Sequence, residues 1–209
     1  MDRSGRKNAQ KQKTIQMNNP KKEKGYEQVR KKITNCKKCS LYKTRKNPVP
    51  GEGFLKAKIM LIGEAPGAQE DKNGYPFCGK AGKILDELLD SVGIKRKKIY
   101  ITNILKCRPP RNRGPKENEI EACVSYLEKQ IEIIQPGVIC TLGNYSTAYI
   151  LKKYGLEGKI RGISLIHGKI FEPNGLNIIP FYHPAAATYN PRLKKTLKKD
   201  FKILKRFFH

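Results

Sequence analysis

Acidic residues are scarce in this sequence. Only 18 Asp and Glu stand against 44 Lys and Arg in 209 residues, which leaves a formal net charge of +26. No segment approaches the roughly 18 uninterrupted apolar residues that a membrane helix needs. The first sixteen residues contain no apolar run either, so a secretory signal is not expected. These absences predict a soluble, cytoplasmic protein without a membrane partner, and the length suits one domain with tails.

The excess of positive charge predicts a polyanionic partner, with nucleic acid the first candidate and an anionic membrane surface the second. A bias of composition toward lysine would explain the charge without any partner. Residues 1–24 carry eight Lys and Arg against two acids, and they lack aromatic residues. We therefore predict a disordered basic tail over residues 1–24 and one domain over residues 25–209.

Strand-like and helix-like segments alternate after the tail. Short apolar runs predict strands, and apolar residues at helical spacing predict the helices between them. The predicted strands are 58–63, 99–102, 138–142 and 177–181, and the predicted helices are 80–92, 117–134, 145–153 and 191–208. Strands separated by helices favour a parallel sheet with both faces covered. The predicted fold class is α/β, a three-layer α/β/α arrangement around a mainly parallel, four-stranded sheet.

Six cysteines are present, and disulfides are not expected in a chain without an export signal. Cys36 and Cys39 form a C-x-x-C pair, a spacing that lets two thiolates reach one metal centre. Cys107 follows a predicted strand and Cys123 lies on the next predicted helix. Four cysteines accept either zinc or a [4Fe–4S] cluster, so the residues alone leave the metal open. Cys107 and Cys123 would serve equally well as small buried apolar residues.

Two glycine-rich runs follow the first predicted strand, GEAPGAQED at 63–71 and GYPFCGKAG at 74–82. Loops at the carboxyl ends of parallel strands are where α/β proteins bind ligands. The GKS or GKT ending of a Walker phosphate loop is absent, which excludes that class. Asn103 directly follows the second predicted strand and His183 follows the last one, so both are expected at the same edge. An asparagine amide offers a donor and an acceptor, as recognition of a base edge requires.

The sequence resembles the family 4 uracil-DNA glycosylases, the iron–sulfur members of the uracil-DNA glycosylase superfamily. Five motifs carry the resemblance in order: GEAPG, ED, G-x-PF-x-G-x-AG, TN-x-x-KCRPP and HPAA. The similarity runs from about residue 33 to residue 207. It implies a uracil-DNA glycosylase-like fold and hydrolysis of the N-glycosidic bond of uracil in DNA, which leaves an abasic site for base excision repair. It also implies that a structural [4Fe–4S] cluster is held by Cys36, Cys39, Cys107 and Cys123.

The resemblance assigns catalytic roles to Glu70, Asn103 and His183. Asn103 is expected to accept from N3–H of the flipped uracil and to donate to O4. His183 is expected to donate to O2 as negative charge grows on the departing base. Glu70 is expected to position the attacking water or to stabilise the positively charged sugar. Phe77 is expected to stack on the uracil ring.

The same resemblance places Glu64, Ala65 and Gly67 in the wall of the uracil pocket. Ala65 stands where another branch of the superfamily has an aspartate that activates water, so no carboxylate fills that position here. Tyr189 and Arg192 are candidates for contact with DNA. The expected partner is uracil-containing DNA, single- or double-stranded, and a monomer is expected.

Three alternatives come from other classes. A subgroup that captures uracil covalently through a histidine would need a basic insert ending in that histidine, whereas His167 has no arginine-rich segment before it. A non-catalytic DNA- or RNA-binding protein on the same scaffold is disfavoured by the intact Glu70, Asn103 and His183. A zinc-binding nucleic-acid module predicts a colourless protein.

Overall fold

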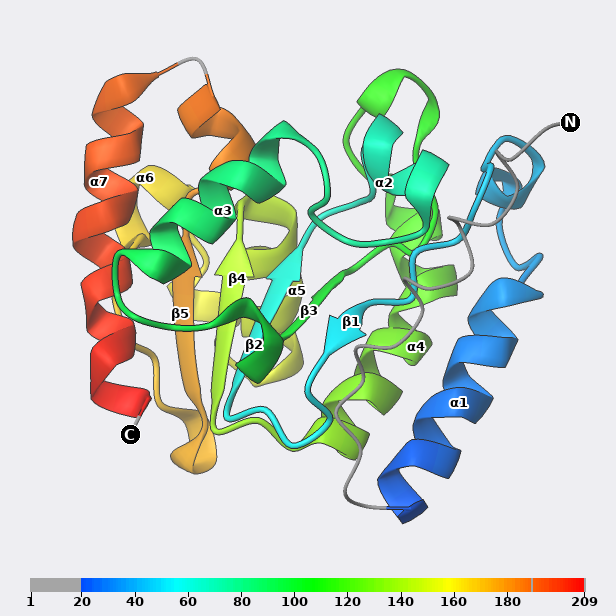
Figure 1. Ribbon diagram of the computed structural model, residues 1–209, viewed down its shortest axis with the longest axis horizontal. Helices are drawn as coiled ribbons and strands as arrows, with labels where there is room; N and C mark the ends of the chain where they lie inside the picture. Colours follow the sequence, from blue (N-terminus) through cyan, green and yellow to red (C-terminus); the bar gives the residue numbers. More distant parts are fainter. Residues whose placement is uncertain (1–19, 189, 209) are drawn as a thin grey trace, which may run out of the picture.

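The computed structural model describes residues 20–188 and 190–208 (Figure 1). Its first helix, α1 (Pro20–Thr34), buries Tyr26, Val29 and Ile33 on one face. Proline is well suited to the first turn of a helix because its missing N–H has no intrahelical acceptor there. Residues 20–24 therefore lie in a helix, and their assignment to a disordered tail was wrong. The remainder of the predicted tail lies outside the described residues.

One sheet of five strands runs through the molecule in the order β1-β3-β2-β4-β5. Four of its strands confirm the predicted ones and pair in parallel: β2 (Ile59–Gly63), β3 (Tyr100–Asn103), β4 (Val138–Leu142) and β5 (Asn177–Phe181). The prediction of four strands was wrong by one. The short β1 (Glu52–Gly53) adds to the edge, antiparallel to β3. Two residues without an apolar pattern give no local strand signal, and only their pairing with β3 makes them one.

Helices pack against the sheet through two separate apolar clusters. The longer ones are α3 (Lys80–Asp90), α4 (Glu117–Ile134), α5 (Asn144–Lys153) and α7 (Pro191–Phe201). Leu61 of β2 belongs to the cluster formed with α3 and α7, whereas Met60 and Ile62 belong to the one formed with α4 and α5. Successive side chains of a strand point to opposite faces, so α3 and α5 cover different faces of the sheet (Figure 1).

Shorter helices complete the chain. They are α2 (Ala68–Asn73) and α6 (Ile163–Ile166), neither of which was predicted. The helix predicted over 191–208 is divided, because α7 ends at Phe201 and a 3₁₀ segment, Lys202–Phe207, follows. Among the described residues, no helix has both the length and the hydrophobicity that crossing a membrane requires.

Candidate active site and cysteine centre

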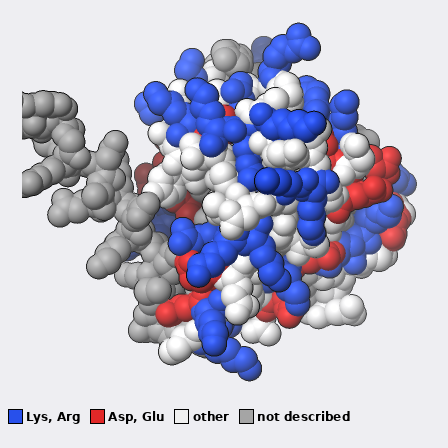
Figure 2. All heavy atoms as spheres, turned by 90° about the vertical axis from the view of Figure 1, so that its right-hand side faces the viewer, with Lys and Arg blue, Asp and Glu red and all other residues white. Residues whose placement is uncertain are grey.

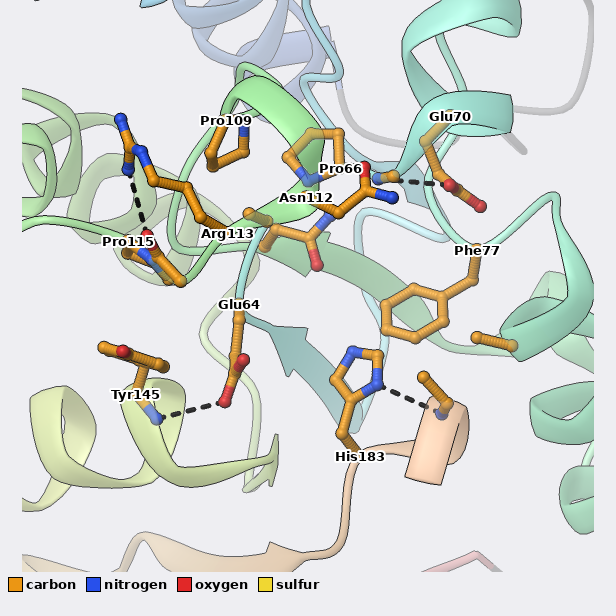
Figure 3. A pocket seen from close by; sticks show the side chains of 16 residues that line it. Glu64, Pro66, Glu70, Phe77, Pro109, Asn112, Arg113, Pro115, Tyr145 and His183 are labelled. Atoms are coloured by element: carbon orange, nitrogen blue, oxygen red, sulfur yellow. Dashed lines mark hydrogen bonds between the residues drawn. The ribbon is translucent and has the colours of Figure 1, made fainter. Parts of the chain in front are cut away.

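A cavity of about 490 Å³ opens where the parallel strands end (Figure 3). The loops that follow β2, β3 and β5 contribute to its wall, as does the first turn of the helix after β4, as expected for the carboxyl edge of an α/β sheet. The structure brings together here every predicted pocket and catalytic residue: Glu64, Ala65, Gly67, Glu70, Phe77, Asn103 and His183.

Asn103 is 2% exposed at the end of β3. Its Oδ1 is the buried side-chain oxygen that has no hydrogen-bond partner within residues 20–188 and 190–208. A side chain at Gly63 would collide with this oxygen and with the ring of Phe77. Glycine in the GEAPG motif therefore lets the amide and the ring approach the same strand end.

Phe77 adopts a backbone φ of 49°, in the left-handed region that phenylalanine rarely occupies. This conformation costs about 1–2 kcal/mol. Its carbonyl packs so closely against α3 that any side chain at Gly82 would collide with it. The ring lies over the imidazole of His183, with centroids 5.6 Å apart and planes inclined by 27°. Strain of this kind gathers at ligand sites, where the surrounding structure holds it.

His183 is held as a neutral donor. Its Nδ1 accepts from the backbone N–H of Ala185 at 3.1 Å, so the single proton of the neutral ring resides on Nε2. Burial among protein atoms lowers the pKa of His183 to about 4, and the charge of Glu70 acts in the opposite direction. At neutral pH the imidazole therefore offers an Nε2–H to the cavity (Figure 3).

Glu70 joins the two glycine-rich loops. Its Oε2 accepts from Gly67 N at 3.1 Å, and its Oε1 accepts from Cys78 N and Gly79 N, both at 2.9 Å. A carboxylate has about four acceptor positions, so one remains for a ligand or a water. The side chain thus holds the shape of the cavity wall while still facing the cavity.

Glu64 connects the GEAPG loop to α5. Its Oε1 accepts from Tyr145 N at 3.2 Å (Figure 3). Burial raises the pKa of Glu64, and hydrogen bonds from the backbone of Tyr145 and Asn144 oppose that shift. A carboxylate at the first turn of a helix also interacts favourably with the helix dipole.

Part of the wall was missed by the sequence analysis. Asn112 and Arg113 follow β3, Tyr145 follows β4, and all three line the cavity. Asn112 has a φ of 56° and accepts from Arg108 Nε at 2.7 Å. Arg113 makes a two-pronged pair with the buried Glu119, at 2.8 and 2.5 Å. The run RPPRNRGP, at 108–115, lies in the segment between a predicted strand and the next predicted helix, so the rule that ligands bind at carboxyl ends would have found it.

The four predicted cluster ligands, Cys36, Cys39, Cys107 and Cys123, belong to one apolar cluster or pack against it. We call these four residues the cysteine centre. Cys107 and Cys123 are buried in a cluster with Ile33 of α1, and Cys36 and Cys39 pack against it. The backbone brings these residues together from the end of α1, from the loop after β3 and from α4. The described part of the chain contains no group of three or more His, Cys, Asp or Glu that could hold a single metal ion.

Donors surround the sulfur atoms of the cysteine centre. Arg45 Nη1 lies 3.1 Å from Cys107 Sγ, Lys106 N lies 3.3 Å from Cys123 Sγ, and Lys38 N lies 3.5 Å from Cys36 Sγ. Burial raises the pKa of the Cys123 thiol to about 11. Burial also lowers the pKa of Lys106 to about 7, and charge on the nearby cysteines opposes this shift.

Basic side chains are prominent on one face of the molecule. On the face shown in Figure 2, Lys and Arg cover more of the area than Asp and Glu do. Arg192 is exposed at the start of α7, where its backbone N–H donates to Asn190 Oδ1 at 3.0 Å. Tyr189, the other predicted DNA contact, lies outside the described residues.

Comparison with known proteins gives the class first. Residues 50–205 match the family model described as the uracil DNA glycosylase superfamily, and the chain belongs to this superfamily. The resemblance inferred from the motifs is thereby confirmed.

Individual relatives then narrow the class. The chain is 51% identical over 178 residues to the type-4 uracil-DNA glycosylase of Saccharolobus solfataricus, which covers 83% of this chain and 82% of that protein. It is 48% identical to the type-4 enzyme of Sulfurisphaera tokodaii, over 86% of this chain and 83% of that protein. It is 46% identical to the type-4 enzyme of Archaeoglobus fulgidus, over 82% and 87%.

Proposed function

We propose that this protein is a type-4 uracil-DNA glycosylase that hydrolyses the N-glycosidic bond of uracil in DNA and leaves an abasic site. One observation carries the proposal: Asn103 Oδ1 is buried, has no hydrogen-bond partner among the described residues, and lies at a cavity that also presents His183 and Phe77. Leaving a buried acceptor unpaired costs about 1–3 kcal/mol, which a ligand with an N–H donor offsets. Uracil N3–H is such a donor, and the names of the relatives support this reading.

The base enters the cavity after extrusion from the DNA stack. Phe77 stacks on its ring, a contact worth about 1–3 kcal/mol. Asn103 accepts from N3–H and donates to O4, a pattern that matches uracil and opposes cytosine at both positions. Thymine presents the same two groups, so its 5-methyl group is excluded by the shape of the wall that Glu64, Ala65 and Gly67 help to form.

His183 stabilises the leaving group. As the glycosidic bond breaks, negative charge develops on uracil O2, and the Nε2–H of the neutral imidazole donates to it. A donor aimed at developing charge commonly contributes about 3–4 kcal/mol to the transition state. The low pKa of His183 is compatible with this role, because the ring needs no second proton to donate.

Glu70 acts on the sugar side. Three of its acceptor positions are taken by backbone N–H groups, which leaves one for the attacking water. Its negative charge also stabilises the positive charge that develops on deoxyribose. The fixed carboxylate needs no rearrangement when that charge appears.

The cysteine centre is proposed to hold a [4Fe–4S] cluster. The four cysteines, from three separate segments, share one apolar cluster, and N–H groups from Arg45, Lys106 and Lys38 approach three of the sulfurs, as hydrogen bonds do in such clusters. Cys36, Cys39, Cys107 and Cys123 would hold the cluster, which would brace the loops that follow α1 and β3 without taking part in the hydrolysis. We also propose that the fold is the three-layer α/β/α arrangement of the uracil-DNA glycosylases.

DNA, single- or double-stranded, is the proposed partner, with Tyr189 and Arg192 as its contacts. The net charge of +26 supports DNA as the partner, because neutralising phosphates provides affinity that does not depend on sequence. A monomeric state and a cytoplasmic location remain predictions, and sedimentation and cell fractionation test them.

The test uses matched oligonucleotides that carry uracil or thymine at one position, each single- and double-stranded. The protein is incubated with them, and alkali then cleaves at abasic sites. We expect cleavage at uracil and none at thymine. Folded protein with intact metal content that leaves uracil in place would refute the proposed activity.

A further inference from the structure

Lys106 is a buried lysine that neither the cavity wall nor the cysteine centre includes. It is 1% exposed, three residues after Asn103 and directly before Cys107. Its Nζ donates to Asn103 O at 2.7 Å, to Thr102 Oγ1 at 2.7 Å and to Gln130 Oε1 at 2.8 Å. Three acceptors require three N–H donors, and an ammonium group has three.

All three of these acceptors are neutral. Burying an ammonium group among neutral acceptors is unfavourable, so the burial of Lys106 must be offset by what its hydrogen bonds do. Gln130 is itself fixed, because its Nε2 donates to Pro50 O at 2.6 Å and to the hydroxyl of Tyr100 at 3.1 Å. The ammonium therefore ties the end of β3 to a rigid point on α4.

The same residue reaches the cysteine centre through its backbone. Lys106 N donates to Cys123 Sγ at 3.3 Å, and Lys106 O accepts from Val49 N at 2.8 Å. Cys123 lies on α4, seven residues before Gln130. One residue thus contacts the strand end that presents Asn103, the helix that carries Cys123, and a cysteine sulfur.

We propose that Lys106 is a positioning residue, which fixes the last carbonyl of β3 so that the Asn103 amide is already aimed at the extruded base. This inference rests on the proposed function, because it takes Asn103 to read uracil. Within the part of the chain that the structure describes, the amide oxygen has no hydrogen-bond partner, so its direction depends on the backbone behind it. A misplacement of about 1 Å at such a group can lower a rate about 100-fold.

A double-mutant cycle with Asn103→Ala tests the inference. Lys106→Met keeps the length of the side chain and removes its three donors. We expect Lys106→Met to lower single-turnover excision of uracil about 10- to 100-fold. In the Asn103→Ala background the same change should cost less than about threefold, because residues that act through one another are not additive. Equal factors in both backgrounds, or a wild-type rate in Lys106→Met, would overturn the role.

A binding measurement and a control variant distinguish an effect on positioning from an effect on stability. Binding of free uracil by calorimetry, which involves no turnover, should show the same non-additivity. Ile131→Ala, beside Gln130 on α4, removes packing without touching the network, and its effect should be equal in both backgrounds. Thermal unfolding and iron content are measured for every variant.

If Lys106→Met does not fold, Gln130→Met provides the test instead. This substitution removes one acceptor of Lys106 Nζ and leaves the lysine in place. Its smaller loss, about 3- to 10-fold, should also disappear in the Asn103→Ala background; a loss that persists there counts against the role. If Asn103→Ala itself excises uracil like the wild type, the proposed reading of the base fails, and the inference fails with it. If Asn103→Ala is impaired and Lys106 acts additively, only the inference fails.

Discussion

Asn103 of the cavity and Cys107 of the cysteine centre are only four positions apart in the chain. The two regions nevertheless differ in how far their polar atoms have hydrogen-bond partners. At the cavity, Asn103 Oδ1 has no hydrogen-bond partner within residues 20–188 and 190–208, and Phe77 has a strained backbone. At the cysteine centre, donors approach the sulfurs of Cys36, Cys107 and Cys123, and apolar residues enclose them.

This difference matches the residence time of what each region is proposed to hold. A transient ligand is bound best by groups that gain their hydrogen bonds only when it arrives, so the free cavity keeps them unsatisfied. A permanent group is enclosed once, during folding, and its surroundings can be satisfied in advance. The unsatisfied groups at the cavity therefore lower the free energy of unfolding, and contacts elsewhere in the fold must offset this loss.

The largest effect is expected from the cavity, in His183→Ala. Loss of a donor to developing charge should lower the single-turnover rate about 100- to 1000-fold, with DNA affinity nearly unchanged. His167→Ala is the matched control. His167 pairs with Asp200 at 2.7 Å and does not line the cavity, so its variant should keep the rate. Wild-type kinetics in His183→Ala would remove this residue from the mechanism.

At the cysteine centre the expected loss is stability and metal rather than rate alone. Cys123→Ser should lower the iron content from about four per chain and reduce the free energy of unfolding by at least about 3 kcal/mol, or about 6–12 °C in Tm. Cys140→Ser makes the same change at another buried cysteine, in β4. It should retain iron, and an iron content equal to that of Cys123→Ser would contradict the ligand assignment.

Asn103→Asp changes the recognition of the base at the cavity and leaves the cysteine centre unaltered. A carboxylate accepts from the amino group of cytosine but has no donor for uracil O4, and each mismatch costs about 1–3 kcal/mol. We expect loss of uracil excision and weak excision of cytosine, clearest where the cytosine is mispaired or single-stranded. Oligonucleotides that differ only in uracil, cytosine or thymine provide the measurement. Unchanged uracil activity would show that Asn103 does not contact the base edge.

The smallest effect concerns pH. Because the pKa of His183 is about 4 in the folded protein, against 6.5 ordinarily, the unfolded chain takes up a proton before the native one does. The stability linked to this residue is thus present above pH 6.5 and is lost as pH falls toward 4. Protonation also places a hydrogen on Nδ1, which then cannot accept from Ala185. NMR titration of the histidine rings should give a His183 midpoint near 4, and the excision rate should show no inflection at 6.5. A midpoint near 6.5 would contradict the desolvated ring.

The sequence by itself determined the parts that rest on local patterns. The parallel strands, the long helices and the order of the motifs follow from apolar periodicity and from glycine placement, and the structure confirms the strands within a residue at each end. The convergence of Asn103 and His183 at one cavity also followed from sequence, because parallel strands present their carboxyl ends at a common edge.

Tertiary structure alone decided what depends on contacts between distant residues. Glu70 was expected to act on water or sugar, but the hydrogen bonds that make it a clamp join two loops, and no local pattern records them. Lys106 stands within the TN-x-x-KCRPP motif, which assigns it no contact, and only the packing of α4 on β3 adds its third acceptor, Gln130 Oε1. Each of these features is a hydrogen bond formed only after the chain has folded, and periodicity carries no information about it.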